Sequence, residues 1–287
     1  MSRWSRRRFA LAVVASLSMA CGDRSAPAAA PGPRVVSQTV LSDEVLWALG
    51  PAVRTQVVAV STMADDVRYS GVAGQWPTTL PRAAGTGEAL LALSPSMVIL
   101  ASFTAAETRA LITKAGLPTL LLEHFDGFDD YRANVTAIAE AVDATAAGRQ
   151  LVQEFDDRLA ALRIDDSQGP RVVSWNEGSV PGEGTSFDDI ARAAGFRNLP
   201  ADQGRKGHLQ IGLEQLVAWD PDVIVVPCGT ASCDEVAREV AARPGLRGTR
   251  AARESNVIAV PSRSLYSTGA GMLDVVELLA ASRKAAP

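Results

Sequence analysis

Short apolar runs alternate with longer stretches of helical periodicity along most of the chain. A continuous run such as 97–100 indicates a buried strand, whereas 88–93 and 213–219 have the length and spacing of helices. Strand and helix in regular alternation predict parallel sheets wrapped by helices, which is an α/β fold. Strands are expected at 57–60, 97–100, 119–122, 171–175, 223–226 and 257–260.

Polar residues mark several expected helix starts. Ser42 is expected to cap a helix that runs through Leu49, because its hydroxyl can accept a hydrogen bond from a free backbone N–H. Thr104 and Glu107 have the spacing of a capping box at the start of another helix. These signals place helices between the expected strands, as the alternation requires.

A long amphipathic stretch separates the two series of strands. Apolar residues follow one another there on a single helical stripe, at Leu151, Phe155, Leu159 and Leu162. About twenty helical residues span about 30 Å, the width of a small domain. The stripe itself indicates core packing, but its position predicts a helix that joins two α/β lobes. We expect an N-terminal lobe at 34–143, a linker helix at 144–165 and a C-terminal lobe at 166–287.

An internal repeat supports this division into lobes. Residues 88–99 recur as 214–225 at a constant offset of 126, and both copies have the pattern of a helix, a proline-marked turn and a buried strand. Glu88 and Glu214 take the same place near the start of each helix. A chance match is the alternative for so short an α/β unit, but two equivalent lobes explain the repeat better.

The first 21 residues have the features of an export signal. A run of arginines precedes an apolar stretch from Phe9 to Ala20, which is too short to cross a bilayer of about 30 Å as a mature helix. The basic segment resembles a twin-arginine export motif, and Ala20-Cys21 resembles the end of a bacterial lipoprotein signal. Residues 1–21 are therefore predicted to be a signal peptide with lipidation at Cys21, plain cleavage being the alternative. Residues 22–33 are expected to be a flexible tether.

Composition and charge limit the classes of partner. The chain is 47% hydrophobic and has a net charge of −4. Loss of the signal leaves 24 basic and 32 acidic residues, a net charge of −8. An acidic chain without a basic run outside its signal is not suited to a nucleic-acid partner.

Two cysteines remain when Cys21 is set aside. Cys228 and Cys233 enclose a short segment of small, turn-forming residues, and an exported protein meets an oxidising compartment. A local disulfide is therefore predicted. The pair has no neighbouring Cys or His and would make a poor zinc site, so no metal site is expected.

Several motifs together resemble a known family. The two Glu-x-x-x-Ala-x-x-Pro-x-x-Val units, the segment Ala-Ala-Gly-Phe-Arg-Asn at 193–198 and the segment Asp-Pro-Asp-Val-Ile at 220–224 are similar to periplasmic binding proteins for iron-siderophores, haem and cobalamin. The resemblance covers nearly all of 34–284. It implies two Rossmann-like α/β lobes with parallel sheets, bridged by one long α-helix, and a ligand cleft between the lobes. It also implies a periplasmic protein that delivers a metal chelate to an ABC permease in the inner membrane, and we expect a monomer without a cofactor.

Within this resemblance, Glu88 and Glu214 acquire a second interpretation. In these binding proteins the matching glutamate of each lobe lies at an exposed tip and pairs with an arginine of the permease. The resemblance therefore implies permease docking through Glu88 and Glu214. Capping is the alternative, because an acidic side chain is favoured at the positive end of a helix dipole.

Candidate ligand contacts follow from the positions of the loops. In open parallel sheets, ligands bind beyond the carboxyl ends of the strands. The loops that follow the expected strands are rich in aromatic residues and hold a few arginines, which suits a large flat or amphipathic chelate. The candidate ligand-binding residues are Tyr69, Trp76, Arg82, Phe103, Trp175, Arg263 and Tyr266.

An exported hydrolase and an envelope sensor domain are the competing classes. The chain contains no Gly-x-Ser-x-Gly elbow, no His-Glu-x-x-His motif and no phosphate-binding Gly-x-x-x-x-Gly-Lys, and it has only two histidines. No catalytic residue is therefore assigned. A sensor domain is compatible with the same fold and stays open at this point.

Overall fold

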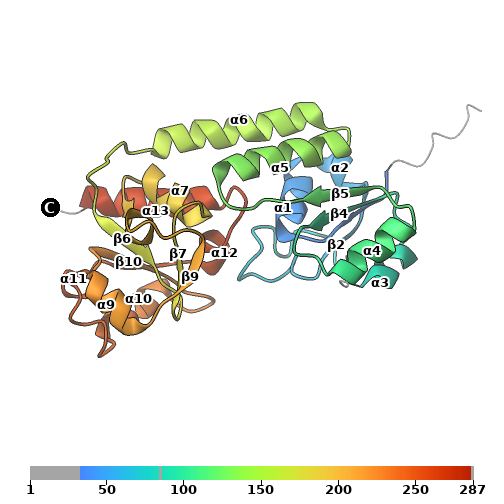
Figure 1. The fold of residues 1–287 in the computed structure, drawn as a ribbon. Helices are drawn as coiled ribbons and strands as arrows, with labels where there is room; N and C mark the ends of the chain where they lie inside the picture. Colours follow the sequence, from blue (N-terminus) through green and yellow to red (C-terminus); the bar gives the residue numbers. More distant parts are fainter. Residues whose placement is uncertain (1–32, 84–85, 286–287) are drawn as a thin grey trace, which may run out of the picture. The chain divides into compact units, whose positions relative to one another are not determined.

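Two parallel β-sheets organise the computed structural model, which describes residues 33–83 and 86–285 (Figure 1). The first sheet contains β1 (Val35–Ser37), β2 (Val57–Ser61), β3 (Arg82–Ala83), β4 (Met97–Ala101) and β5 (Thr119–Leu122). The second contains β6 (Arg171–Ser174), β8 (Arg197–Asn198), β10 (Val223–Pro227) and β11 (Val257–Val260). Their orders are β3-β2-β1-β4-β5 and β11-β10-β6-β8, and all neighbours are parallel. The predicted α/β class is confirmed.

Helices connect most of the successive strands and cover the sheets. Those of the first half are α1 (Val40–Ala48), α2 (Pro51–Arg54), α3 (Gly87–Ala92), α4 (Ala106–Lys114) and α5 (Phe128–Ala141). Those of the second half are α7 (Ser186–Ala193), α8 (Leu199–Asp202), α9 (Leu213–Trp219), α10 (Cys233–Ala242), α11 (Arg250–Arg253), α12 (Ser262–Leu265) and α13 (Met272–Ala285). An antiparallel pair, β7 (Ser179–Pro181) with β9 (His208–Gln210), lies in the second half. We call the first half the N-terminal lobe and the second half the C-terminal lobe.

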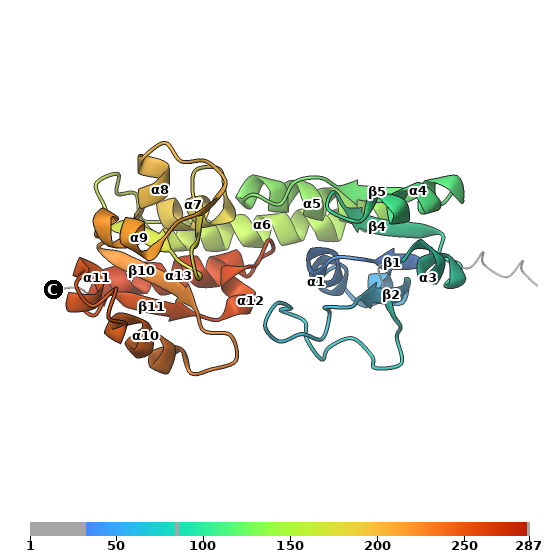
Figure 2. The same cartoon turned by 60° about the horizontal axis from the view of Figure 1, so that its bottom comes forward.

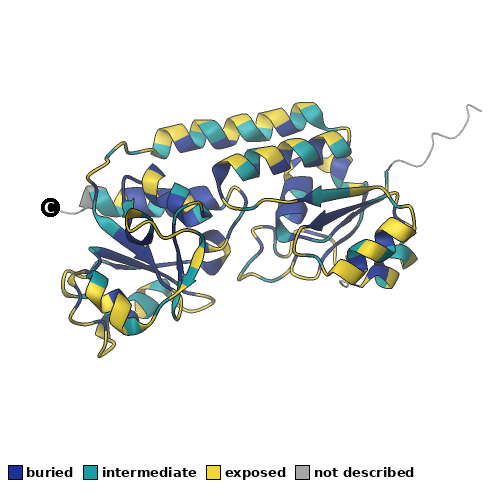
Figure 3. Ribbon diagram, viewed as in Figure 1, coloured by how far each residue is buried: buried dark blue, intermediate teal, exposed yellow. Residues whose placement is uncertain are grey.

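The sheets are buried because their strands are apolar on both faces. Val35 and Val36 of β1 and Ile224 and Val225 of β10 are fully buried. Parallel sheets need such continuous apolar runs, since helices cover both of their faces. Figure 3 shows the central strands of both lobes largely in the colour of buried residues.

The helix α6 (Thr145–Leu162) joins the two lobes. It lies beside α5, where the Phe155 ring contacts that of Tyr131 at a centroid distance of 4.6 Å (Figures 1 and 2). About one turn further along, Arg158 forms ion pairs of 2.8 Å with Asp274 and Glu277 of α13. The linker helix therefore packs against helices of both lobes and limits their relative movement.

Two of the expected helix caps differ in detail. Thr39, and not Ser42, is the N-cap of α1, and Ser42 takes the third helical position of a reciprocal capping box. The helix α4 begins after Ala105 without a side-chain cap, because the Thr104 hydroxyl accepts a hydrogen bond from the Ala101 N–H instead. In both cases the helix lies where the sequence placed it, but the capping partner was wrong.

Predictions for the N-terminus lie outside the described residues. These are the signal peptide at 1–21, the lipidation of Cys21 and all of the tether at 22–33 except Pro33. Within the part of the chain that the structure describes, no helix is both long and apolar enough to traverse a bilayer.

Candidate functional site

Two tyrosines from different lobes face each other. Tyr69 lies in the loop between β2 and β3, and Tyr266 directly follows α12. Their rings are stacked, with centroids 6.3 Å apart and planes 30° from parallel. This separation is near the long end of the range for aromatic pairs, about 4.5–7 Å. Tyr266 remains 42% exposed, so the facing rings are open to solvent.

Cavities surround the tyrosine pair. One of about 150 Å³ is lined by both tyrosines together with Glu44 and Met63. A second cavity, of about 270 Å³, is lined mainly by residues of the C-terminal lobe, Tyr266 among them, and also by Phe125 of the N-terminal lobe. A third, also about 270 Å³, extends from Glu44 to Arg263. All three are lined in part by the segment 263–274, and we call them together the interlobe cleft.

Four of the predicted ligand contacts lie at or near this cleft. Tyr69, Tyr266 and Arg263 line its cavities. Phe103, which is 75% exposed, packs its ring against the cleft residue Phe125 at a centroid distance of 5.4 Å. The structure therefore brings these four residues together, and their contact with a ligand stays a prediction.

Arg82 is directed toward its own lobe. Its guanidinium donates hydrogen bonds of 2.7 and 3.0 Å to the carboxylate of Asp65 and a further bond to the carbonyl oxygen of Leu80. In the same loop Arg68 forms an ion pair of 2.6 Å with Asp66. The positive charges of this loop are thus matched by neighbouring carboxylates.

The two tryptophans correct the sequence-based expectation. Trp76 is only 2% exposed and packs edge-on against Trp47 in the core of the N-terminal lobe. Trp175 is 7% exposed and belongs to the core of the C-terminal lobe, where Arg243 lies over its ring at 5.4 Å. Trp175 continues the alternation of β6 and so shares the buried side of Val173, because alternate residues of a strand point to the same face. Neither lines the interlobe cleft.

Two adjacent carboxylates on α1 were not predicted as part of the site. Asp43 accepts hydrogen bonds from the Ser61 N–H and hydroxyl, the latter at 2.5 Å. Burial raises the pKa of Asp43 to about 6, although hydrogen bonds from Ser37 and Ser61 oppose the shift. Glu44 accepts a hydrogen bond from the Gly71 N–H at 2.7 Å and lines the cleft. Two acids in the apolar run of this helix were the sequence signal for buried carboxylates.

A fourth cavity, larger than each of the three in the interlobe cleft, lies elsewhere in the C-terminal lobe. It has a volume of about 480 Å³ and lies beside α7 and β8. Its arginines are already paired, Arg192 with Asp188 and Arg197 with Asp202. It has no aromatic pair comparable with that of the interlobe cleft, so its size does not make it the better site.

Glu88 and Glu214 occupy matching positions in the two lobes. Each lies in the first turn of its helix, α3 or α9, and each is exposed. Both helices lie on the side of the fold away from α6 in Figure 1. Neither carboxylate has an ion-pair partner within residues 33–83 and 86–285.

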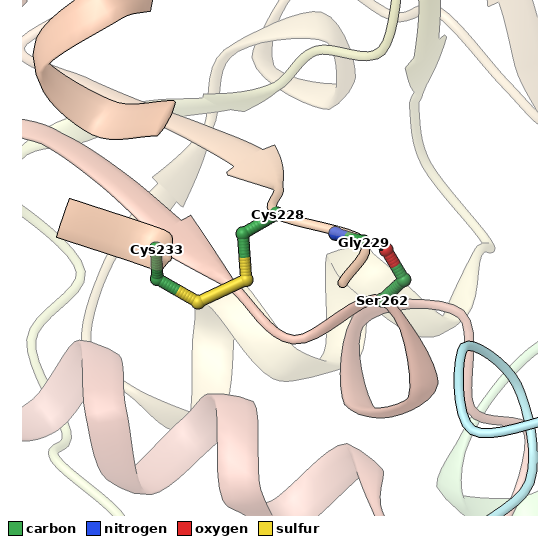
Figure 4. The surroundings of a disulfide bond; sticks show 4 residues. All are labelled: Cys228, Gly229, Cys233 and Ser262. Carbon is green, nitrogen blue, oxygen red and sulfur yellow. Dashed lines mark hydrogen bonds between the residues drawn. A yellow bond between two sulfur atoms is a disulfide. The ribbon is translucent and has the colours of Figure 1, made fainter. Parts of the chain in front are cut away.

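Cys228 and Cys233 lie at the rim of the C-terminal sheet. Their sulfur atoms are 2.06 Å apart in a disulfide that closes the loop between β10 and α10 (Figure 4). Within this loop the Gly229 N–H donates a hydrogen bond of 3.0 Å to the hydroxyl of Ser262, the first residue of α12. The loop is therefore tied to the short helix that precedes Tyr266.

The fold and its cleft define a two-lobed binding protein. The model of the periplasmic binding protein family matches residues 35–264, and the chain belongs to that family. It is a family of binding proteins and not of enzymes, so the hydrolase alternative is set aside. No curated protein sequence matches the chain.

Solved structures show the same architecture. The haem-binding protein RhuT of Roseiflexus sp. RS-1 is 25% identical with a TM-score of 0.71, over 88% of this chain and 97% of that one. The haem-binding protein BhuT, in complex with two haems, is 25% identical with a TM-score of 0.71, over 87% and 97%. The vitamin B12-binding protein BtuF of Vibrio cholerae, 21% identical with a TM-score of 0.71 over 89% and 98%, shares the fold.

Proposed function

We propose that this chain is an extracytoplasmic receptor that binds a metal chelate between Tyr69 and Tyr266 and delivers it to an ABC importer. The main evidence for this proposal is the stacked tyrosine pair, which presents one ring from each lobe to a shared cavity. Two roughly parallel aromatic faces suit a flat ligand, since offset stacking is a favoured aromatic geometry. A ligand between them needs about 7–8 Å, twice the usual contact distance, so the rings would move apart slightly from their separation of 6.3 Å. Haem is the chelate that this geometry favours, and RhuT and BhuT are named as haem-binding proteins.

The charges near the cleft are compatible with haem. Arg68 and Arg82 are matched by Asp66 and Asp65. Arg263 lines the cleft and has no ion-pair partner among the described residues. A carboxylate-bearing flat ligand, held between the rings, would place its negative charge toward this arginine. An iron-siderophore or a corrinoid is the alternative ligand class.

Delivery would use the two exposed glutamates. We assign Glu88 and Glu214 to docking on arginines of an ABC permease, because one carboxylate on each lobe fixes the orientation of the complex. A lipid attached to Cys21 would hold this monomeric receptor near the permease in the inner membrane. The matched exposure of the two side chains supports this proposal.

The ligand proposal is tested by titration of the mature chain with hemin, ferrioxamine B and cyanocobalamin. Hemin should bind and give a shifted Soret band. Tyr69→Ala and Tyr266→Ala should each weaken hemin binding about 10- to 100-fold, the usual effect of losing a buried aromatic anchor. Tyr69→Phe and Tyr266→Phe are the matched controls and should retain most of the affinity, because they keep the ring faces.

Each other outcome of this titration has a definite meaning. Unchanged hemin affinity in both alanine variants would place the site away from the tyrosine pair. Binding of ferrioxamine B or cyanocobalamin in place of hemin would reject haem and retain the receptor function. Binding of none of the three would contradict the proposed ligand class.

A further inference from the structure

The side chain of Glu44 lies between the two loops that carry the tyrosines. Its Oε1 atom accepts a hydrogen bond of 2.7 Å from the N–H of Gly71, two residues after Tyr69. Its Oε2 atom faces Gly269, three residues after Tyr266, where an added Cβ would approach that oxygen to 2.7 Å. One carboxylate of the N-terminal lobe therefore contacts both tyrosine loops, one from each lobe.

The two glycines make this close approach possible. A Cβ at Gly71 would lie 3.1 Å from Oε1, and one at Gly269 would lie closer still to Oε2. Neither glycine has a positive φ angle, so backbone conformation does not require glycine at either position. The close contact with the Glu44 carboxylate is the physical reason for glycine on both sides.

Glu44 also forms the wall between two cavities of the cleft. On one side is the cavity of about 150 Å³ with the tyrosine pair. On the other is the cavity of about 270 Å³ that contains Arg158 and Arg263. No ion pair joins Glu44 to either arginine, and Arg158 is already bound to Asp274 and Glu277. Among the residues that the structure describes, no cation therefore pairs with this carboxylate inside the cleft.

We propose that Glu44 is a positioning residue that holds the Tyr69 and Tyr266 loops together across the lobes, and that its protonation makes ligand affinity depend on pH. The proposal rests on the proposed function, because it assigns the tyrosine pair to the ligand. Glu44 itself is given no contact with the ligand; it acts through the two loops.

The electrostatic surroundings of Glu44 give the direction of the pH effect. Burial raises the pKa of Glu44 to about 7; the hydrogen bond from Gly71 opposes this shift, and the negative charges of Asp43 and Asp274 add to it. Burial, followed by the charge of Glu44, also raises the pKa of Tyr131 to about 12. The titratable and charged groups around Glu44 come from both lobes: Asp43 on α1, Tyr69 in the β2–β3 loop, Tyr131 on α5, Arg158 on α6, Arg263 on α12, Tyr266 after α12 and Asp274 on α13.

Protonation allows the carboxyl group to serve both loops. A neutral Glu44 keeps one oxygen as acceptor for the Gly71 N–H and has an O–H to donate toward the opposite loop. An ionised Glu44 is acceptor-only and places an unpaired charge near Asp274. Because the pKa of Glu44 is raised in the fold, the stabilisation from its neutral form is fully present below the ordinary pKa of 4.5. This stabilisation is lost as pH rises through about 7.

The first test measures hemin affinity of the mature chain by Soret titration between pH 5.5 and pH 8.5. A ligand in the tyrosine cavity would cover Glu44 and favour its neutral form, and a difference of one pKa unit between the bound and free states corresponds to a tenfold change in affinity. We expect the natural chain to lose about tenfold in affinity across this range. Glu44→Gln should bind equally at both ends, because the amide resembles the protonated carboxyl. Glu44→Ala should bind hemin about tenfold more weakly than Glu44→Gln does at all pH values.

Controls separate positioning from a general loss of structure. Glu140→Gln is the matched control, since Glu140 is an exposed glutamate of α5, and it should behave as the natural chain. Melting temperatures of all variants report on folding, and Glu44→Gln keeps the proposal testable if Glu44→Ala does not fold. A natural pH profile in Glu44→Gln, or natural affinity in Glu44→Ala, would overturn the proposal.

A second readout needs no ligand. Backbone hydrogen exchange at pH 8, in the free protein, should be faster in Glu44→Ala than in Glu44→Gln at both 69–72 and 266–271. Faster exchange in the first segment alone would overturn the link between the lobes. If hemin does not bind the natural chain, the proposed ligand is wrong, and the exchange measurement still decides the role of Glu44.

Discussion

The helix–turn–strand units of the two lobes can be compared residue by residue. The helix α3 starts at Gly87 and α9 at Leu213, while β4 and β10 span 97–101 and 223–227, so the offset of 126 holds for the backbone as well as the sequence. The turn residues Ser94 and Asp220 both have positive φ, at 47° and 44°. The same local conformation is therefore built twice.

An arginine at the first strand of each lobe holds this turn. Arg34 donates to the carbonyl oxygen of Ser94 at 3.0 Å, and Arg171 donates to that of Asp220 at 2.6 Å. The backbone N–H of each arginine is also bound by a side chain of the unit. For Arg34 the acceptor is the Ser96 hydroxyl at 2.7 Å, and for Arg171 it is the Asp222 carboxylate at 2.8 Å.

The lobes differ in the charge of the side chain that accepts the hydrogen bond from the arginine N–H, Ser96 in one lobe and Asp222 in the other. Asp222 forms ion pairs of 3.1 Å with both Arg171 and Arg250, whereas Ser96 has a single neutral hydroxyl. Burial opposes ionisation of Asp222, but its hydrogen bonds and the two positive charges outweigh that effect and lower its pKa. The comparison teaches that the turn and its arginine determine the geometry, and that the ion pairs are an addition in the C-terminal lobe.

Docking is the largest effect expected from this comparison. The double variant Glu88→Arg with Glu214→Arg should abolish uptake of haem iron, because each lobe would then repel the arginines of the permease. Each single variant should reduce uptake in part, if the lobes dock equivalently. Uptake in cells is the measurement, with hemin affinity and melting temperature expected to stay unchanged.

The control for docking reverses two other exposed glutamates, Glu107 on α4 and Glu140 on α5. Glu107→Arg with Glu140→Arg should leave uptake intact. Full uptake by the docking variant would contradict the proposal. A lower melting temperature in that variant would favour helix capping, which is worth about 0.3–1 kcal/mol per site.

Loss of the acceptor for the strand arginine gives the next largest effect. Asp222→Ala should lower the free energy of unfolding by about 2 kcal/mol, because several hydrogen bonds to a charged group are lost, and Ser96→Ala by about 1 kcal/mol. Asp222→Ser introduces the residue of the N-terminal lobe and should recover part of the loss. Urea unfolding measures all three. Equal losses in the two alanine variants would show that the ion pairs of Asp222 add nothing.

The sequence predicted the strands well and the irregular elements poorly. Continuous apolar runs define buried strands, so β4 and β10 begin where expected and extend one residue further. The helix α5 was not predicted, although its buried residues Tyr131, Val135 and Ile138 have helical spacing. The strands β7 and β9 have only three residues each, which is too short for a periodic signal.

The site was predicted in part, for a reason that the tryptophans illustrate. Position in a loop beyond a strand indicated Tyr69 and Tyr266, which line the cleft, but it does not give the direction of a side chain. Trp175 follows β6 directly and turns into the core with Val173. Glu44 was missed because its importance depends on two loops from different lobes, and no local pattern carries that information.

The smallest effect concerns the positive φ at the turn of each unit. A left-handed conformation costs a non-glycine residue about 1–2 kcal/mol, whereas glycine adds about 0.5–1 kcal/mol of chain entropy to the cost of folding. Ser94→Gly should therefore raise the free energy of unfolding by about 0.5 kcal/mol. Asp220→Gly should lower it, because the Asp220 carboxylate accepts a hydrogen bond of 2.6 Å from the Arg250 N–H at the start of α11, a contact worth about 1 kcal/mol. Changes of opposite sign in the free energy of unfolding, measured in urea, would show that the two turns share a conformation but differ in the hydrogen bonds of their side chains. A loss of stability in Ser94→Gly would contradict the strain assigned to that position.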